Sequence, residues 1–385
     1  LRLMDKIFWE ENKTMKKIFT IFVAVMALFL AVSCGPKENT DKKGYDYDAI
    51  PDTITADSYE IAFVTDIGQL KDKSFNQGTW EGIKRYAKEN DKTYKYYQPA
   101  NGDKATTDDR YNAMKSAVDG GAKIIVCAGF MQGDALGRAI VDFKDTKFVF
   151  VDGWAMGASN LTAIVFKEEQ SGYLAGYAAV KEGYTKLGFS GGGNGTNPAC
   201  QRFGYGFIQG ANDAAKELGK TVSMRYSWLY GAAFSASDEL TAMLKGWYTT
   251  GTEVVFSCGG SMCNSAFAAA AENGKKVIGV DVDQSNQSST VITSATKGLR
   301  EGTMEALAVF FNGEWDAKAA DKAQNLGAEK DCVGLPTDTW SMVNFTKEQY
   351  QELFAKVKAG SISIDNDPAG AETKEYSNVK LEWFK

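Results

Sequence analysis

The fold class of this 385-residue chain is decided by residues 60–78, EIAFVTDIGQLKDKSFNQG. Residues 60–65 form a short apolar run of the kind found in buried strands. A loop bearing glycine and aspartate follows, and residues 78–88 then carry apolar side chains at the spacing of one helix face. This order of strand, polar loop and helix is the repeating unit of a parallel α/β fold.

The same unit recurs along the rest of the chain. Further strands are predicted over residues 94–97, 123–127, 147–152, 186–189, 221–226, 253–257, 276–281 and 291–294, and helices over 108–118, 133–143, 171–181, 203–218, 237–246 and 265–273. Continuous apolar strands separated by helices imply parallel sheets that are covered on both faces. Such sheets bind ligands beyond the carboxyl ends of their strands, so the loops that follow strands are the places to search.

Composition restricts the chemistry. The chain has 43 Lys and Arg, 49 Asp and Glu, a net charge of −6 and no histidine. Without histidine there is no Ser-His-Asp or Cys-His catalysis and no His-ligated zinc, although carboxylate and lysine chemistry stays open. The acidic balance argues against nucleic acid as a partner.

The N-terminal segment is typical of a secretion signal. Residues 15–33 combine a basic start, an apolar run of about 15 residues and a small-residue end, which is too short for a stable membrane span. Cys34 follows directly, in a pattern that resembles a bacterial lipoprotein box, so we expect it to carry a lipid that anchors the protein to the cell membrane. Simple secretion with an incidental cysteine is the alternative. Residues 1–14 are expected to lie upstream of the true start, and residues 34–57 are expected to be a flexible tether.

Two side chains in the first loop suit a planar ligand. Phe75 can stack on an aromatic ring, and Asn76 can pair with the polar edge of that ring. The structural alternative is that Ser74 or Asp72 caps the following helix and that Phe75 is a hydrophobic staple.

Three later loops carry further chemistry. Asp281 ends a strand with a carboxylate that suits a pair of vicinal hydroxyls, and Lys297 places a cation beyond the next strand. Either residue could instead belong to a surface ion pair. Gly260 lies in a glycine turn that leaves backbone N–H groups open, or that serves only as a tight bend. Residues 191–195, GGGNG, lack the third glycine of a dinucleotide loop and no Walker lysine follows, so phosphate binding is disfavoured.

Five cysteines remain besides Cys34, so at least one is free or pairs between chains. Cys258 and Cys263 could close a small loop. Cys127 and Cys258 both end apolar runs, which favours buried thiols, and no histidine or CxxC pair completes a zinc site. We therefore expect no metal and no cofactor.

Four segments together resemble the basic membrane protein family of surface lipoproteins, the substrate-binding components of nucleoside ABC transporters. The segments are residues 61–86, 165–179, 188–213 and 277–285, and they include DKSFNQG and GVDVDQ. The resemblance spans roughly residues 59–365. It implies a type I periplasmic-binding-protein fold, in which two Rossmann-like lobes joined by three crossovers close on a purine nucleoside.

The resemblance also implies roles for individual residues. Phe75 and Asn76 would hold the base, with Asp152 as a second base contact and Asp66 close by. Phe234 would cover the other face of the base, although the motif is distorted and Trp228 or Tyr230 could substitute. Asp281 and Lys297 would bind the ribose hydroxyls, and the glycine turn at Gly260 would approach the ribose.

We therefore predict an α/β protein with a first lobe over residues 58–160 plus about 291–330, a second lobe over 161–290 plus about 331–368, and a tail over 369–385. The expected function is capture of adenosine, guanosine or inosine outside the cell membrane and delivery to an ABC permease, without catalysis. The alternatives are a receptor of the same fold for a sugar or autoinducer-like polyol, or a nucleoside hydrolase using Asp281 and Asp283. The hydrolase is disfavoured because residues two apart in a strand point to opposite faces.

Overall fold

The computed structural model describes residues 45–67 and 69–384 of the chain. The predicted signal peptide and Cys34 lie outside the described residues. Two compact units are distinguished, residues 1–46 and residues 47–385, and the helices and strands given below belong to the second. Within the described part of the chain, no helix has the length and apolar character that a bilayer crossing requires.

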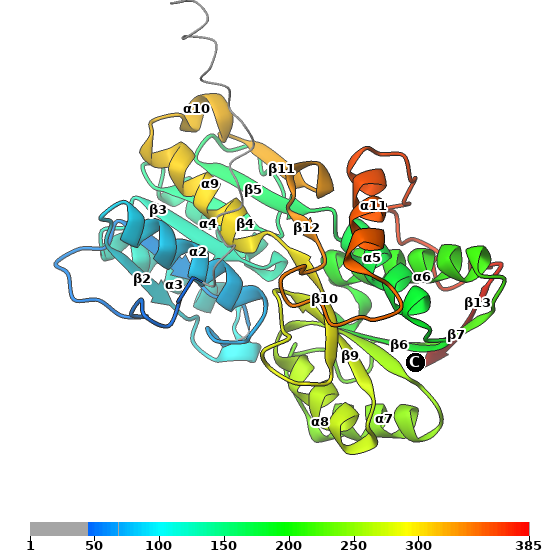
Figure 1. The fold of residues 1–385 in the computed structure, drawn as a ribbon. Coiled ribbons are helices and arrows are strands. Elements are labelled where there is room, and N and C mark those ends of the chain that lie inside the picture. The colour runs from blue at the N-terminus through cyan, green and yellow to red at the C-terminus, as the bar shows by residue number, and fades with distance from the viewer. Residues whose placement is uncertain (1–44, 68, 385) are drawn as a thin grey trace, which may run out of the picture. The chain divides into compact units, whose positions relative to one another are not determined.

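Two separate sheets organise the second unit (Figure 1). The first has the order β11-β5-β4-β3-β1-β2 and is entirely parallel. The second has the order β12-β10-β9-β8-β6-β7-β13, in which only β12 pairs antiparallel. The first sheet contains β1 (Ile61–Val64), β2 (Tyr94–Tyr97), β3 (Ile124–Ala128), β4 (Lys147–Val151), β5 (Leu161–Phe166) and β11 (Lys322–Leu326); the second contains β6 (Lys186–Gly191), β7 (Val222–Ser227), β8 (Val254–Cys258), β9 (Lys276–Asp281), β10 (Val291–Lys297), β12 (Val333–Gly334) and β13 (Val379–Phe384).

Helices cover both faces of each sheet, which defines a first and a second lobe (Figure 1). The first lobe contains α2 (Phe75–Glu89), α3 (Thr107–Asp119), α4 (Gly133–Asp142), α9 (Leu299–Phe311) and α10 (Trp315–Lys318); the second contains α5 (Glu168–Glu182), α6 (Pro198–Glu217), α7 (Asp238–Thr249), α8 (Cys263–Asn273) and α11 (Lys347–Lys358). Short 3-10 helices are η2 (Gly102–Lys104), η3 (Phe130–Gln132), η4 (Gly193–Gly195), η5 (Gly260–Met262) and η6 (Ala328–Lys330). Within each lobe the helices pack as pairs, α2 with α9, α3 with α4, α5 with α6 and α7 with α8.

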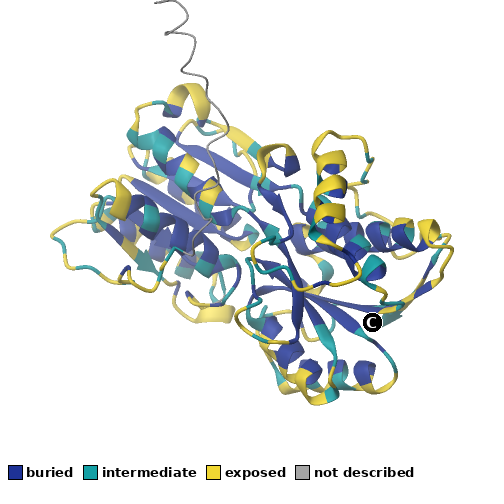
Figure 2. Ribbon diagram, viewed as in Figure 1, coloured by how far each residue is buried: buried dark blue, intermediate teal, exposed yellow. Residues whose placement is uncertain are grey.

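The alternation of side chains along the strands explains why both faces are covered. In β1, Ala62 and Val64 join the apolar cluster under α3 and α4, whereas Phe63 points to the other face and stacks on Trp80 of α2. All four residues of this strand are buried. Figure 2 shows the same arrangement throughout, with buried sheets between helices whose outer faces are exposed. Strands that are apolar on both faces are therefore stable only in the interior of such layers.

Three crossovers join the lobes, as the resemblance implied. They lie between β5 and α5, between β10 and α9, and between β11 and β12. They also lie side by side, because the Gly298 N–H donates to the Cys332 carbonyl at 2.7 Å and the Lys167 N–H donates to the Leu326 carbonyl at 3.0 Å. Neighbouring crossovers of this kind form a hinge between two lobes.

The structure corrects the predicted lobe boundaries at three strands. β5 pairs with β4 and so belongs to the first lobe, whereas β10 pairs with β9 and belongs to the second. The predicted tail contains β13, which pairs with β7 at the edge of the second sheet. The chain crosses to the other lobe only after β5 and β10 have each paired within their own sheet. The apolar pattern of the sequence does not show in which sheet a strand pairs, so the predicted boundaries fell before these strands.

The predicted tether is also corrected, because its last part is docked on α2. The buried ammonium of Lys84 donates to the carbonyls of Tyr47 and Ile50, each at 3.0 Å, and to the Asp52 carboxylate at 2.9 Å. Trp80 donates its indole N–H to the same carboxylate at 3.0 Å. A buried ammonium needs several acceptors, and residues 47–52 supply them, so this segment is ordered by Lys84.

Candidate functional site

The carboxyl ends of the two sheets face one cavity, which encloses about 530 Å³ of space including its mouth. This is the position at which parallel α/β sheets bind ligands. All eight residues predicted from the sequence line it: Asp66, Phe75, Asn76 and Asp152 from the first lobe, and Phe234, Gly260, Asp281 and Lys297 from the second.

The loop before α2 is built around Asp72, which is buried. One carboxylate oxygen accepts from the backbone N–H groups of Ser74 and Gln77, and the other accepts from the backbone and the amide of Asn76. Asp72 therefore provides the helix capping that the sequence allowed for, since the N-cap Ser74 makes no side-chain cap bond. Phe75 is half-buried and lines the cavity, so it is not confined to a role as a staple.

Asn76 connects this loop to the end of β1. Its amide oxygen accepts the backbone N–H of Asp66 at 3.0 Å, while its amide nitrogen donates to Asp72 at 3.1 Å. Burial raises the pKa of Asp66 to about 7 and that of Asp72 to about 6. Both carboxyl groups at this end of the cavity therefore have raised pKa values. Asp72 accepts from four N–H groups, whereas Asp66, whose Oδ1 has no partner among the described residues, can accept or donate a hydrogen bond depending on its protonation.

Phe234 reaches the cavity because glycines leave room for its ring. A Cβ atom added at Gly192 would lie 2.4 Å from the ring, and one added at Gly193 would lie 2.9 Å from it. Phe234 itself has a left-handed backbone with φ of 53°, which a phenylalanine adopts only when its surroundings require it. The glycine stretch that resembled a phosphate loop therefore accommodates an aromatic ring.

The two other candidates for this second aromatic position do not line the cavity. Trp228 packs against the glycine stretch, within 3.0 Å of a Cβ added at Gly195, and the side chain of Tyr230 is 49% exposed.

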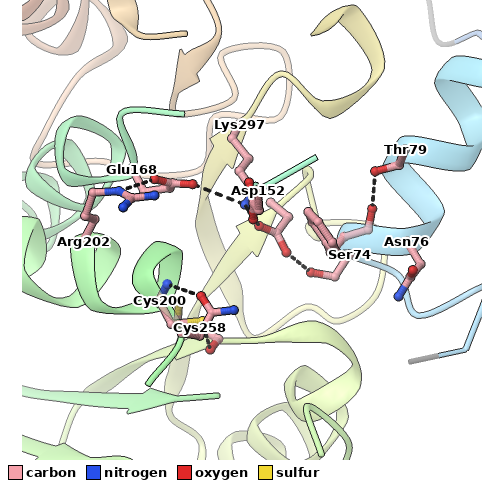
Figure 3. Close-up of polar contacts among 12 residues, drawn as sticks. Ser74, Asn76, Thr79, Asp152, Glu168, Cys200, Arg202, Cys258 and Lys297 are labelled. Carbon is pink, nitrogen blue, oxygen red and sulfur yellow. Dashed lines mark hydrogen bonds and ion pairs between the residues drawn. The ribbon is translucent and has the colours of Figure 1, made fainter. Parts of the chain in front are cut away.

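Lys297 is the central charged group of the site (Figure 3). Its ammonium lies 2.5 Å from Asp152, 3.4 Å from Glu168 and 3.7 Å from Asp281. It also lies 4.9 Å from the centre of the Phe75 ring, within the range of a cation–π contact. These partners come from the first lobe, the hinge and the second lobe, so one buried cation joins all three parts.

The pKa directions follow from this cluster. Burial alone lowers the pKa of Lys297, but attraction to Asp152, Asp281 and Glu168 raises it well above its usual range, so the ammonium is charged. Burial raises the pKa of Asp152 to about 6 despite the attraction of Lys297. Burial also raises the pKa of Asp281, against the opposing effects of Lys297 and of a hydrogen bond from Ser74. The cluster is therefore a poorly solvated set of charges whose carboxylates depend on Lys297 for compensation.

Sequence reasoning missed two charged residues that support Lys297. Glu168 is fully buried at the start of α5, and its other oxygen accepts from Arg202 of α6 at 2.7 Å. Figure 3 shows Arg202, Glu168 and Lys297 in succession. The two adjacent glutamates of EEQ, in the segment 165–179, were visible in the sequence, but no local pattern indicates that Glu168 lies beside Lys297.

The cavity wall also contains Ile67, Asp72, Gly129, Asn197, Ala199, Cys200, Phe203, Cys258, Gly259 and Val280.

The cysteines of the described part of the chain are free and buried, including Cys258 and Cys263. Cys200 and Cys258 lie together in the cavity wall, where the Cys200 thiol is 3.6 Å from the Cys258 carbonyl oxygen. Burial raises the pKa of Cys258 far above its usual range, so this thiol is a small apolar wall group and not a nucleophile. Among the described residues no cluster of three or more His, Cys, Asp or Glu side chains is arranged to hold a metal ion.

With this geometry in place, comparison with known proteins identifies the family. A family profile described as ABC transporter substrate-binding protein PnrA-like matches residues 60–366. The chain belongs to this family. The resemblance to basic membrane proteins is thereby confirmed, and the function of the family, substrate binding for ABC transporters, agrees with a cavity between two lobes.

Curated relatives are similar along much of the chain. The "ABC transporter nucleoside-binding protein BmpA" of Lactococcus lactis is 34% identical over 238 residues, which cover 58% of this chain and 64% of that protein, just under two thirds of its length. The "CD4+ T-cell-stimulating antigen" of Listeria monocytogenes is 28% identical and covers 80% of this chain and 89% of that protein. "Basic membrane protein A" of Borreliella burgdorferi is 26% identical over 82% of this chain and 89% of that protein.

Solved structures support the fold. An ABC transporter solute-binding protein from Aeropyrum pernix has a TM-score of 0.69 at 18% identity and covers 81% of this chain and 95% of that chain. A second, from Conexibacter woesei, has a TM-score of 0.63 at 18% identity and covers 80% of this chain and 99% of that chain. The predicted α/β fold of type I periplasmic binding proteins is confirmed.

Proposed function

We propose that this chain is a receptor that captures purine nucleosides in the cavity between its lobes and delivers them to an ABC permease. Phe75 and Phe234 would enclose the base, and Asn76, Asp66 and Asp152 would face its polar edge. Asp281, Lys297 and the turn at Gly260 would bind the ribose. Release of the unchanged ligand requires no catalytic group, in keeping with the lack of histidine.

The observation that carries this proposal is the convergence of the eight residues. They come from seven loops or element ends spread over more than 200 positions, and all line one cavity. The set combines aromatic rings, carboxylates and one cation, which suits a ligand with a planar ring and several hydroxyls. The lactococcal relative is named as nucleoside-binding, which supports the same ligand class.

A thermal-shift and calorimetry panel tests the ligand class. Adenosine, guanosine and inosine are each expected to raise the Tm of the purified protein, whereas free ribose and unrelated sugars are not. Phe75→Ala should weaken nucleoside binding by about tenfold to a hundredfold, since it removes one face of the base contact. Phe354→Ala is the matched control, because Phe354 is a half-buried phenylalanine on α11 that does not line the cavity.

Each alternative has its own outcome in this panel. Binding of a sugar or polyol without any response to nucleosides would replace the nucleoside proposal. Release of free base during an overnight incubation would indicate a hydrolase. The structure offers little support for the latter, because Asp283 does not line the cavity and instead accepts from Thr339 at 2.6 Å.

We further propose that the protein is anchored by a lipid on Cys34 and works on the outer face of the cell membrane. The support is the sequence of residues 15–34 together with the family, whose transporters take up ligands captured outside the membrane. The full-length protein should fractionate with membranes, and Cys34→Ser should release it into the soluble fraction. Retention of the variant in the membrane fraction would contradict the lipid anchor.

A further inference from the structure

Gln284 lies just after β9 and is fully buried, although it does not line the ligand cavity. Every polar group of its side chain is engaged. The amide oxygen accepts the Val280 backbone N–H at 3.1 Å, and the amide nitrogen donates to the Lys73 carbonyl at 2.9 Å. Its own backbone N–H donates to the Ser294 hydroxyl at 3.0 Å. A side chain bonded through both its amide oxygen and its amide nitrogen, on a residue whose backbone is also bonded, has one orientation, so Gln284 is a rigid link.

This link joins the two lobes. Val280 belongs to β9 of the second lobe, and the residue after it is Asp281. Lys73 belongs to the loop before α2 of the first lobe, two residues before Phe75. One amide group therefore bonds to the backbone of the residue directly before Asp281 and to the backbone of the residue two positions before Phe75.

The backbone on both sides of Gln284 is shaped for this contact. Lys73 has a left-handed conformation with φ of 60°, which is costly for lysine and directs its carbonyl toward the second lobe. At position 279 a Cβ atom would lie 2.5 Å from the Gln284 amide oxygen, so glycine there leaves the space that this side chain occupies. A left-handed backbone such as that of Lys73 persists when the surrounding contacts compensate for its conformational cost.

A second polar contact across the same gap lies beside the first. The Ser74 hydroxyl donates to Asp281 at 2.5 Å. The two contacts use adjacent residues of the first lobe and neighbouring residues of the second. They place the loop of Phe75 and Asn76 against the strand end that carries Asp281.

We propose that Gln284 is a positioning residue that fixes the base-binding loop against the ribose-binding strand end in the closed protein, and so prolongs retention of the ligand without touching it. The inference rests on the proposed nucleoside function. The contact spans the lobes, so it forms on closure and breaks on opening. Loss of the contact should therefore speed dissociation more than it slows association.

Stopped-flow tryptophan fluorescence with guanosine, inosine and adenosine tests this at pH 8. Gln284→Glu keeps the oxygen that accepts from Val280 and replaces the donor to Lys73 by a carboxylate oxygen. We expect its dissociation rate to rise about threefold to tenfold, as for the loss of one hydrogen bond, with an association rate within twofold of wild type. Gln287→Glu is the matched control, because Gln287 is an exposed glutamine of the same loop.

Gln284→Met removes both amide contacts at similar volume and serves if the buried carboxylate prevents folding. Unchanged dissociation in a folded variant, or an equal slowing of association, would overturn the positioning role. Wild-type protein that binds none of the three nucleosides would contradict the proposed function instead. In that case hydrogen exchange at the Ser74 and Asn76 amides still tests the contact, which should protect them less in Gln284→Glu than in wild type; equal protection would overturn it.

Discussion

Asp66 combines a position in the cavity wall with a cost to stability. It lies two residues after β1 and lines the cavity, and its Oδ1 atom is buried with no hydrogen-bond partner in the described part of the chain. Burial raises its pKa from 3.8 to about 7; the backbone N–H of Ile67 and the charge of Arg110 oppose this rise, and the charges of Asp152 and Asp72 add to it. Ionisation of this group therefore opposes folding.

The pH dependence of Asp66→Asn should reveal this cost. A folded pKa above the unfolded value means that the folded state holds its proton more tightly. The destabilisation is thus absent below about pH 4, grows as pH rises, and is complete above about pH 7. In urea unfolding, the free energy of unfolding of the variant should increase relative to that of wild type between these two pH values, by up to about 4 kcal/mol. This follows because each tenfold change in proton affinity is worth about 1.4 kcal/mol. Parallel stability curves for the two proteins would contradict the assignment.

Asp52 provides a control of opposite sign. Burial would raise its pKa, but hydrogen bonds from Lys71, Lys84 and Trp80 outweigh this and lower it to about 2. Its stabilisation is present above about pH 4 and is lost as pH falls through about 2. Asp52→Asn should therefore be less stable than wild type at neutral pH, with a difference that disappears in acid.

At the scale of elements, the α5–α6 pair determines where several cavity residues lie. Glycines of each helix contact the backbone of the other. A Cβ atom at Gly172 or Gly176 would lie 2.1 Å from the carbonyl oxygen of Phe203 or Phe207. This close packing positions Glu168 at the start of α5 beside Arg202 of α6.

Gly176→Ala should therefore be strongly destabilising. The added methyl group meets backbone atoms, which cannot move without separating the helices, so we expect a loss of about 3 kcal/mol or more in unfolding free energy. Gly246→Ala is the matched control, because Gly246 lies within α7 with no atom near an added Cβ. That substitution should stabilise by about 0.5–1 kcal/mol through helix propensity. Equal effects of the two changes in urea unfolding would contradict the packing argument.

Whether an element could be predicted from the sequence depends on its apolar pattern and on whether its contacts are local. Strands such as β3 and β8 were found because they are apolar throughout, and the residues after them could be placed at the cavity from the rule for parallel sheets. β11 (KAQNL) was missed because its residues are mostly polar and exposed, whereas β5 (LTAIVF) and β13 (VKLEWF) were missed although most of their residues are apolar. The docking of residues 47–52 depends on Lys84, which no local pattern connects to them. The positions of Glu168 and Gln284 depend likewise on contacts between distant segments.

At the scale of the whole molecule, Lys297 connects the parts that must move on closure. It is the last residue of β10, directly before a crossover, and it pairs with Asp152 of the first lobe and Asp281 of the second. Glu168 stands at another crossover. Without the cation these three carboxylates would face one another in a poorly solvated space, and their repulsion would favour separation of the lobes.

Lys297→Met should therefore open the molecule in a pH-dependent way. At pH 8 we expect a larger radius of gyration in small-angle X-ray scattering and a loss of about 3–5 kcal/mol in unfolding free energy, as for a broken buried ion pair. The pKa of Asp152 is already about 6 with Lys297 present, whose attraction lowers it, so removal of the lysine raises it further. Protonation at pH 5 then relieves the repulsion, and both the larger radius and the loss of unfolding free energy should diminish.

Lys245→Met, which breaks the exposed pair with Glu272, should cost at most about 1 kcal/mol and leave the radius unchanged. A radius of Lys297→Met that equals wild type at both pH values would show that this cluster does not govern closure.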